Sequence, residues 1–265
     1  MNSYRSTYSG FFRSLVALGA AGVVLLAASA SATAGTYSVY ACQGPASQPL
    51  PNSSWTMLVD LGGSHGGHFL FGSTCGSLSV AAKPPGAAMA NDDDGARWRF
   101  LAPAGTTIGG YSLDRQLDLS FPGSGTPPKL TAAVREKDLL GTTEFGCVGV
   151  TADCSVAMST LTRSSLSLSE LSVGVGCAEA SGCSNGSYTG ASATLQQARV
   201  DVDDPAAPTV GALTGSLPNS FTPTGIKTVD VTASDVGGGV REITLAIAGV
   251  TVETHAPAGG CNAPS

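Results

Sequence analysis

The sequence predicts an all-β protein, and its composition carries that prediction. Of the 265 residues, 35 are glycine and 15 are proline, and only 12% are charged, about half the share of an average domain. A long surface helix needs a charged or strongly polar outer face. A chain whose polarity comes from Ser, Thr and Gly instead suits short strands joined by many turns. The hydrophobic share of 42% is enough to build a core.

The strands are predicted from short runs of alternating or β-branched residues, each bounded by Gly, Pro, Asn or Asp. These runs are residues 36–41, 55–61, 96–102, 115–120, 129–135, 165–175 and 193–202. In the third run, the period of two places Trp98 and Phe100 on one face and two arginines on the other, which is typical of a half-buried strand. So many strands predict a large antiparallel β-sandwich, jelly-roll or concanavalin-like, over residues 35–203.

A linker and a second domain follow the predicted sandwich. Residues 204–208 (DPAAP) predict a linker, because two prolines force extended backbone and end the preceding strand. The second domain covers residues 209–265. Its clearest strands are 226–233 and 239–248, and the residues between them supply an Asp and consecutive glycines for a tight turn.

The first 34 residues have the three parts of a secretory signal peptide: a basic start, an apolar run over 15–30, and Ala-Thr-Ala at 32–34. Cleavage there leaves Gly35 as the first residue. Cleavage after the Ala-Ser-Ala at 28–30 and an uncleaved anchor are the alternatives. We expect a secreted or cell-surface protein with no membrane insertion after cleavage.

The chain has seven cysteines, Cys42, Cys75, Cys147, Cys154, Cys177, Cys183 and Cys261. In an exported protein these indicate disulfide bonds. Cys147 and Cys154 are close enough in the sequence to close a hairpin or loop, and so are Cys177 and Cys183. This leaves Cys42 to pair with Cys75 and makes Cys261 the odd cysteine. Structural zinc is the alternative, although zinc ligands usually follow a C-x2-C spacing with histidine nearby.

The charge balance excludes some partners. The 13 Lys and Arg against 19 Asp and Glu give a formal net charge of −6, and the basic residues do not cluster along the sequence. Proteins that bind nucleic acid or anionic membranes normally carry a concentrated positive patch. We expect neither partner, and because the sequence lacks a phosphate-binding glycine motif we expect no cofactor.

Three segments resemble an uncharacterised family of exported proteins from soil actinobacteria. They are residues 37–45 (YSVYACQGP), 97–108 (RWRFLAPAGTTI) and 233–240 (ASDVGGGV). The resemblance covers most of the mature chain. It implies a lectin-like or jelly-roll β-sandwich followed by an immunoglobulin-like domain, and it implies no activity or binding residues.

We expect the chain to stop inside this second domain. Only 61 residues run from Pro205 to Ser265, whereas an immunoglobulin-like sandwich needs about 100 residues and seven strands. Cys261 then lacks its partner, and apolar residues such as Val231 and Ile243 lie on an uncovered sheet face. The alternative is a complete small module whose Cys261 forms an intermolecular bridge.

One motif points to hydrolysis. Residues 62–66 (GGSHG) match the G-x-S-x-G pattern that presents a serine nucleophile, here Ser64. The pattern requires a following helix, but residues 67–72 indicate a turn into another strand. The distant histidine, His255, belongs to the second domain. A serine hydrolase using Ser64 is therefore only an alternative.

Two acidic clusters and two aromatic residues are the weak candidates for ligand binding. Asp92 and Asp94 lie in a turn, and Asp201 and Asp203 precede the linker; both pairs offer oxygen ligands for calcium, against the plainer interpretation of solvated turns. His65 and His68 give only two metal ligands, so we predict no metal site. Trp55 and Tyr111 are candidate platforms for sugar rings.

These observations favour a non-enzymatic exported protein with a structural, adhesive or binding role. No acid, base and nucleophile can be assembled from three histidines and scattered carboxylates. A carbohydrate-binding lectin-like module is the first alternative. The expected partners are cell-surface glycans or other surface proteins.

Overall fold

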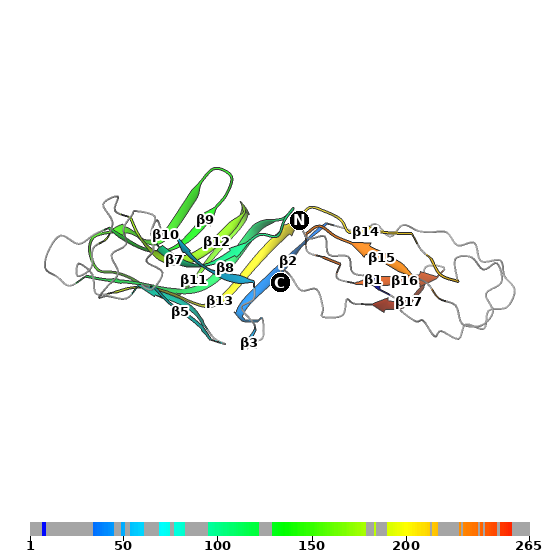
Figure 1. Ribbon diagram of the computed structural model, residues 1–265, viewed down its shortest axis with the longest axis horizontal. Coiled ribbons are helices and arrows are strands. Elements are labelled where there is room, and N and C mark those ends of the chain that lie inside the picture. The colour runs from blue at the N-terminus through cyan, green and yellow to red at the C-terminus, as the bar shows by residue number, and fades with distance from the viewer. Residues whose placement is uncertain are drawn as a thin grey trace. The chain divides into compact units, whose positions relative to one another are not determined.

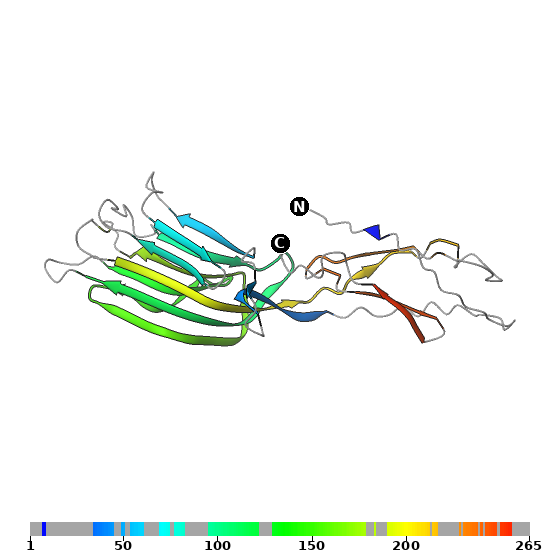
Figure 2. The ribbon, with the colours of Figure 1, turned by 90° about the horizontal axis from the view of Figure 1, so that it is seen from below.

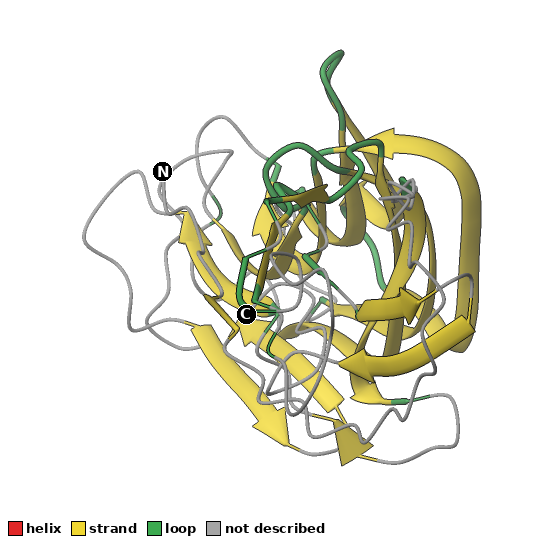
Figure 3. Cartoon of the chain, turned by 90° about the vertical axis from the view of Figure 1, so that its right-hand side faces the viewer, coloured by secondary structure: helices red, strands yellow, loops and turns green. Residues whose placement is uncertain are grey.

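The computed structural model divides the chain into two compact units. One unit runs from Thr36 to Asp203, and the other contains the residues from Asp204 onward together with the N-terminal segment up to Gly35. The structure describes residues 7–8, 34–44, 49–50, 54–60, 69–74, 77–82, 95–121, 129–178, 183, 190–212, 214–216, 228, 230–237, 239–240, 242–247 and 250–255. None of these residues is helical (Figure 3). The division falls where the sequence analysis ends the first domain.

Two sheets build the first unit, and the predicted all-β sandwich is confirmed. The five-stranded sheet has the order β10 (Thr142–Val150), β9 (Leu130–Lys137), β12 (Glu170–Cys177), β7 (Gly95–Leu101), β4 (Trp55–Asp60). The seven-stranded sheet has the order β11 (Cys154–Leu168), β8 (Thr107–Ser120), β13 (Gly190–Asp204), β2 (Gly35–Gln43), β3 (Pro49–Leu50), and also contains β6 (Ser77–Ala82) and β5 (Phe69–Thr74). Figure 2 shows yellow β13 within this sheet, between green β8 and cyan β6.

The inner face of the five-stranded sheet follows the alternation predicted for β7. Trp98 and Phe100 are buried, whereas the arginines between them are only half-buried. Antiparallel register extends these positions across the sheet, since Phe100 pairs with Leu171 and with Trp55, and Trp98 pairs with Val173. Each row therefore places apolar side chains side by side on the face that meets the second sheet.

The seven-stranded sheet is organised around β8 and β13, which pair antiparallel along most of their lengths. On its other side β13 pairs with β6 through Ala191–Leu195 and also neighbours β2. Alternate residues such as Leu113, Leu117 and Val200 are fully buried. The residues between them face away from the core and are mostly polar, so one face of this sheet is free to contact solvent or a ligand.

Specific side-chain contacts join the two layers, whose strands are labelled in Figure 1. The Trp98 indole of β7 donates a 2.9 Å hydrogen bond to the carbonyl oxygen of Ser79 in β6, and its ring meets Phe71 of β5 edge-on at 5.7 Å. Tyr111 of β8 donates a 2.6 Å hydrogen bond to Glu136 of β9. These buried polar groups are satisfied only when the two sheets pack in this arrangement.

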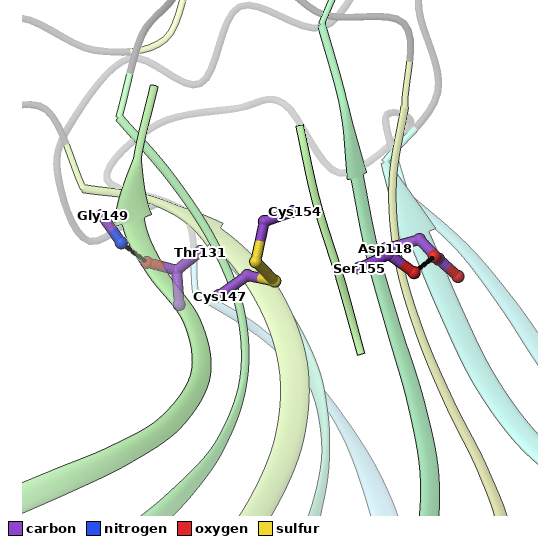
Figure 4. The surroundings of a disulfide bond; sticks show 6 residues. All are labelled: Asp118, Thr131, Cys147, Gly149, Cys154 and Ser155. Atoms are coloured by element: carbon purple, nitrogen blue, oxygen red, sulfur yellow. Dashed lines mark hydrogen bonds between the residues drawn. A yellow bond between two sulfur atoms is a disulfide. The ribbon is translucent and has the colours of Figure 1, made fainter. Parts of the chain in front are cut away.

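Two of the three predicted disulfides are confirmed. Cys147 and Cys154 join β10 to β11, the neighbouring edge strands of the two sheets (Figure 4). Cys177, at the end of β12, bonds to Cys183. Cys42 is fully buried in β2. Its predicted partner Cys75, like Cys261, lies outside the described residues, so that pairing stays a prediction.

The sequence analysis missed β10 and most of β11. Of the fifteen residues of β11, nine are exposed and mainly Ser or Thr, so an apolar alternation is not visible. Gly146 lies inside β10 at a φ of +132°, where a Cβ would approach Leu117 at 2.4 Å. The expected single strand over 165–175 is instead divided at Ser169, because β11 ends at Leu168 and β12 begins at Glu170.

The described residues of the second unit form two small sheets. Its strands are β1 (Thr7–Tyr8), β15 (Val231–Ser234) and β14 (Thr209–Val210) in one sheet, and β16 (Ile243–Ile247) and β17 (Val250–His255) in the other. After β15, where a tight turn is expected, the Asp235 carboxylate accepts a 2.9 Å hydrogen bond from the Gly239 N–H. The strands on either side of it do not pair, however. β15 pairs with β14, and β16 pairs with β17, because the residues after β16 return at once as a hairpin.

The remaining expectations for this part of the chain are mostly untested. Apart from Thr7–Tyr8 and Ala34, the predicted signal peptide lies outside the described residues. The expected linker begins one residue late, since Asp204 still belongs to β13 and its carboxylate accepts a 3.0 Å hydrogen bond from the Ala206 N–H. The immunoglobulin-like character of the second unit stays a prediction.

Candidate functional site

The outer face of the seven-stranded sheet carries a dense array of hydroxyl and carboxylate groups. Alternation turns Asp114 and Asp118 of β8 and Asp201 and Asp203 of β13 away from the core. The neighbouring strands β11 and β2 contribute Ser and Thr at the same level of the sheet. This face therefore offers hydrogen-bonding groups from four adjacent strands.

Each of the four carboxylates accepts a hydrogen bond from a hydroxyl on a neighbouring strand. The donors are Thr160 to Asp114 at 2.5 Å, Ser155 to Asp118 at 2.6 Å, Ser38 to Asp201 at 2.5 Å, and Thr36 to Asp203 at 2.7 Å. Gln116 also donates to Asp118, and Arg199 to Asp201. These bonds hold the acidic side chains close to the sheet surface and fix their orientation.

A hollow of about 130 Å³ lies within this array, lined by Tyr40, Ser112, Asp114, Gln197 and Arg199. The register explains the grouping, because Gln197 is the Cα partner of Asp114 and Arg199 is the partner of Ser112. Tyr40 comes from β2, the strand beside β13. An aromatic ring, a carboxylate, an amide, a guanidinium and a hydroxyl thus surround one shallow space.

Several polar groups around this hollow have no partner within the described residues. Asp114 uses only its Oδ1 atom, in the bond from Thr160, while the Tyr40 hydroxyl and the Gln197 amide make no hydrogen bond with a described residue. Arg199 uses its Nε atom for Asp201. The hollow therefore presents acceptors and donors side by side that are free to bind a ligand.

The two aromatic residues that the sequence analysis proposed as platforms are in the core. Trp55 is 3% exposed and Tyr111 is 1% exposed, so neither can stack against a ligand at the surface. Trp55 packs on Phe100 with ring centroids 5.9 Å apart. The prediction was wrong because period-two alternation places both residues on the inner faces of their sheets.

Tyr111 belongs instead to a buried polar cluster between the sheets. Its hydroxyl donates to Glu136, which is 5% exposed, and the Nε atom of Arg163 lies 3.4 Å from the same carboxylate. The Arg163 guanidinium also lies over the Phe145 ring, 4.8 Å from its centroid. Burial, and then the adjacent Glu136, raise the pKa of Tyr111 well above its ordinary value, so the phenol is a permanent donor.

The predicted acidic candidates give no metal centre where the structure describes them. Asp201 and Asp203 bind hydroxyls of β2, as above, and within the described ranges no three His, Cys, Asp or Glu residues gather in a way that could hold a metal ion. Asp92 and Asp94 lie outside the described residues. So do Ser64, His65 and His68, and the proposed hydrolase therefore stays untested.

The residues around the hollow were not singled out from the sequence. Asp114, Gln197 and Arg199 occupy the polar positions of alternating strands, and such residues usually form no more than a solvated face. A signal was nevertheless present, because three polar positions on one face recur in both 112–116 and 197–201. Only the register of β8 against β13 brings these two segments together.

Comparisons with known proteins give no identity for this chain. No protein-family model matches it, and no curated protein matches it in sequence. The resemblance to exported actinobacterial proteins thus stays a prediction. The described residues contain no helix with the length and hydropathy that a membrane span requires.

Proposed function

We propose that the protein is an exported, non-enzymatic β-sandwich that binds a carbohydrate at the hollow on its seven-stranded sheet. One observation carries the proposal: Tyr40, Asp114 and Gln197 place unpartnered polar groups around one shallow space. A sugar ring offers vicinal hydroxyls and an apolar face. Carboxylate and amide groups suit the hydroxyls, and an aromatic ring suits the apolar face.

The export part of this proposal rests on the disulfides. Two disulfides are formed in the first unit, and such bonds persist mainly in oxidising compartments outside the cytosol. Together with the predicted signal peptide, they support a location at the cell surface or outside the cell.

Binding is favoured over hydrolysis by the number of acids at the hollow. Among the residues that line it, Asp114 is the one carboxylate, whereas glycoside hydrolysis normally uses two that flank the scissile bond. Asp201 stands close by but is engaged by Ser38 and Arg199. This arrangement suits recognition of a ligand without attack on it.

A glycan array with matched variants tests the proposal. We expect the wild-type protein to bind a defined set of glycans, and Tyr40→Ala and Asp114→Asn each to weaken that binding by about tenfold, the loss expected for one buried polar or stacking contact. Thr194→Ala, on the same face of β13 but outside the hollow, is the control and keeps wild-type binding. An array without specific binding, or equal binding by all variants, contradicts the proposal and leaves a structural or adhesive role.

A further inference from the structure

The outer face of the five-stranded sheet gathers four cationic side chains that are scattered in the sequence. Arg97 and Arg99 alternate with the buried residues of β7, and Arg135 and Lys137 do the same on β9. Strand β12 lies between these two strands. Its Ser172 is the Cα partner of both Arg99 and Arg135, so the two arginines flank one small residue.

Among the described residues, two carboxylates on this face neutralise part of the charge. Glu144 of β10 forms an ion pair with Arg135, and the Oε1 atom of Glu170 lies 3.8 Å from the Nε atom of Arg97. Glu170 is also the Cα partner of Lys137. Within the described part of this face, four cations against two anions leave a local excess of positive charge in a protein whose formal net charge is −6.

Arg99 is a half-buried member of this group and has no anionic partner among the described residues. Its guanidinium forms no ion pair with any described residue, and its buried Nε atom has no hydrogen-bond acceptor. A buried donor that also carries charge is costly to leave unpaired. The cost is removed when an external oxyanion accepts hydrogen bonds from the guanidinium, whose planar fork matches a carboxylate or sulfate group.

Small residues between the arginines let these long side chains lie along the sheet. A Cβ on Gly174 would meet the Cβ of Arg97 at 2.4 Å, and Ser172 is 1% exposed. The arginine side chains therefore lie along the outer face of the sheet and are partly buried, with side-chain exposures of 19% for Arg97 and 28% for Arg135. Partial burial keeps water from screening their charges completely and orders their guanidinium groups in advance.

We propose that this arginine face, defined by Arg97, Arg99, Arg135 and Lys137, binds an anionic polysaccharide through its carboxylate or sulfate groups. Arg99 makes the direct contact, and Arg97 and Arg135 flank it. A glycan fits better than nucleic acid, because duplex DNA carries one charge per about 1.7 Å. Two excess positive charges cannot balance that density on an acidic protein. The site lies on the opposite sheet from the hollow and stands independently of it.

The experiment measures binding of the full secreted chain to heparin, to polygalacturonate and to duplex DNA at low and at high salt. We expect tight binding to at least one of the two polysaccharides at low salt, with most of it lost at high salt. Binding to polygalacturonate assigns carboxylate as the recognised group, and binding to heparin alone assigns sulfate. Either result supports the proposal, whereas binding to neither polysaccharide, or tighter binding to DNA, overturns it.

Matched variants then test the role of Arg99. Arg99→Gln weakens polysaccharide binding by about tenfold, the equivalent of one charge-assisted hydrogen bond, and Arg99→Lys loses less because it keeps the charge without the fork. Lys129→Gln removes the same charge about 20 Å along the strand direction from Arg135 and stays within about twofold of wild type, as expected for a screened charge.

Thermal melting of each variant confirms that it is folded. Equal weakening by Arg99→Gln and Lys129→Gln overturns the assignment of the site to Arg99. Tyr40→Ala is expected to leave polysaccharide binding through the arginine face unchanged, so a failure of this site and a failure of the carbohydrate hollow can be told apart.

Discussion

The two units of this chain differ in how much apolar surface they bury. Within the described residues, every hydrophobic residue below 9% exposure lies in the first unit, from Val39 to Val202. In the second unit Ile243 and Leu245 are only half-buried, and Val236 is 73% exposed. Both units have β-rich sequences with alternating apolar residues, so alternation alone does not make a core.

The difference teaches that a β-core requires two sheets that face each other. In the first unit a five-stranded and a seven-stranded sheet pack together, and each alternating strand buries its apolar side against the other layer. The described sheets of the second unit have three and two strands, and small sheets of this kind gain little stability alone. Stability measurements on each unit can therefore break or sharpen this comparison.

The largest expected effect is loss of a core aromatic side chain. Phe100 is fully buried, so Phe100→Ala should reduce the free energy of unfolding of the first unit by about 3–5 kcal/mol. Ile243→Ala, at a half-buried position of the second unit, should cost no more than about 2 kcal/mol. Urea unfolding followed by circular dichroism measures both. Equal losses would show that the second unit has a core of its own.

Removal of the disulfide between β10 and β11 ranks second. Its two cysteines are seven residues apart, and the double variant Cys147→Ser/Cys154→Ser should lower the unfolding free energy of the first unit by about 2–4 kcal/mol. Calorimetry should show its transition moving to lower temperature, with the transition of the second unit unmoved. A shift in both would mean that the units unfold as one.

Loss of the polar contact between the sheets ranks third. Tyr111→Phe leaves the buried Glu136 carboxylate without its hydroxyl donor, which should cost about 1–3 kcal/mol. Tyr40→Phe, which removes a hydroxyl that makes no hydrogen bond with a described residue, is the control and should change little. Chemical denaturation of the two variants measures the difference, and equal stability would mean that Glu136 finds another donor.

The smallest effect concerns pH and the second unit. Burial, and then the nearby Asp204 carboxylate, raise the pKa of Asp235. The folded state therefore binds the Asp235 proton more tightly than the unfolded state does. The stability that this proton contributes is fully present below the pKa of the unfolded state, and it is lost as the pH rises through the raised pKa of the folded state. Asp235→Asn should flatten this dependence in calorimetric scans at several pH values, whereas Glu242→Gln, at an exposed position, should leave it. A wild-type transition that does not vary with pH would contradict the prediction.

Local patterns in the sequence were sufficient for the fold class and for several elements. The alternation around Trp98 and Phe100 gave the correct faces of β7, and short sequence separation gave the two confirmed disulfides. These features depend on neighbours in the chain. The end of β13 was also visible to within one residue, because Pro205 follows its last residue, Asp204.

Features that depend on distant pairing could not be predicted. The hollow needs β8 beside β13, and the arginine face needs β7 and β9 on either side of β12, so neither group of residues is close in the sequence. The exposed edge strand β11 was missed for another reason. A strand that buries few residues shows no alternation of apolar and polar residues in its sequence. In the second unit, the tight turn predicted between segments 226–233 and 239–248 implied that they pair with each other. Instead, β16 pairs with β17, which is the next strand in the sequence.

The placement of the two tryptophans makes their fluorescence a probe of the first unit alone. The chain has only two, Trp55 and Trp98, and both are buried in the first unit. Since the indole of Trp98 is also hydrogen-bonded to the opposite sheet, its emission should report separation of the layers. Intrinsic fluorescence excited in the tryptophan band is therefore blind to the second unit, and iodide should quench it only after the sandwich opens.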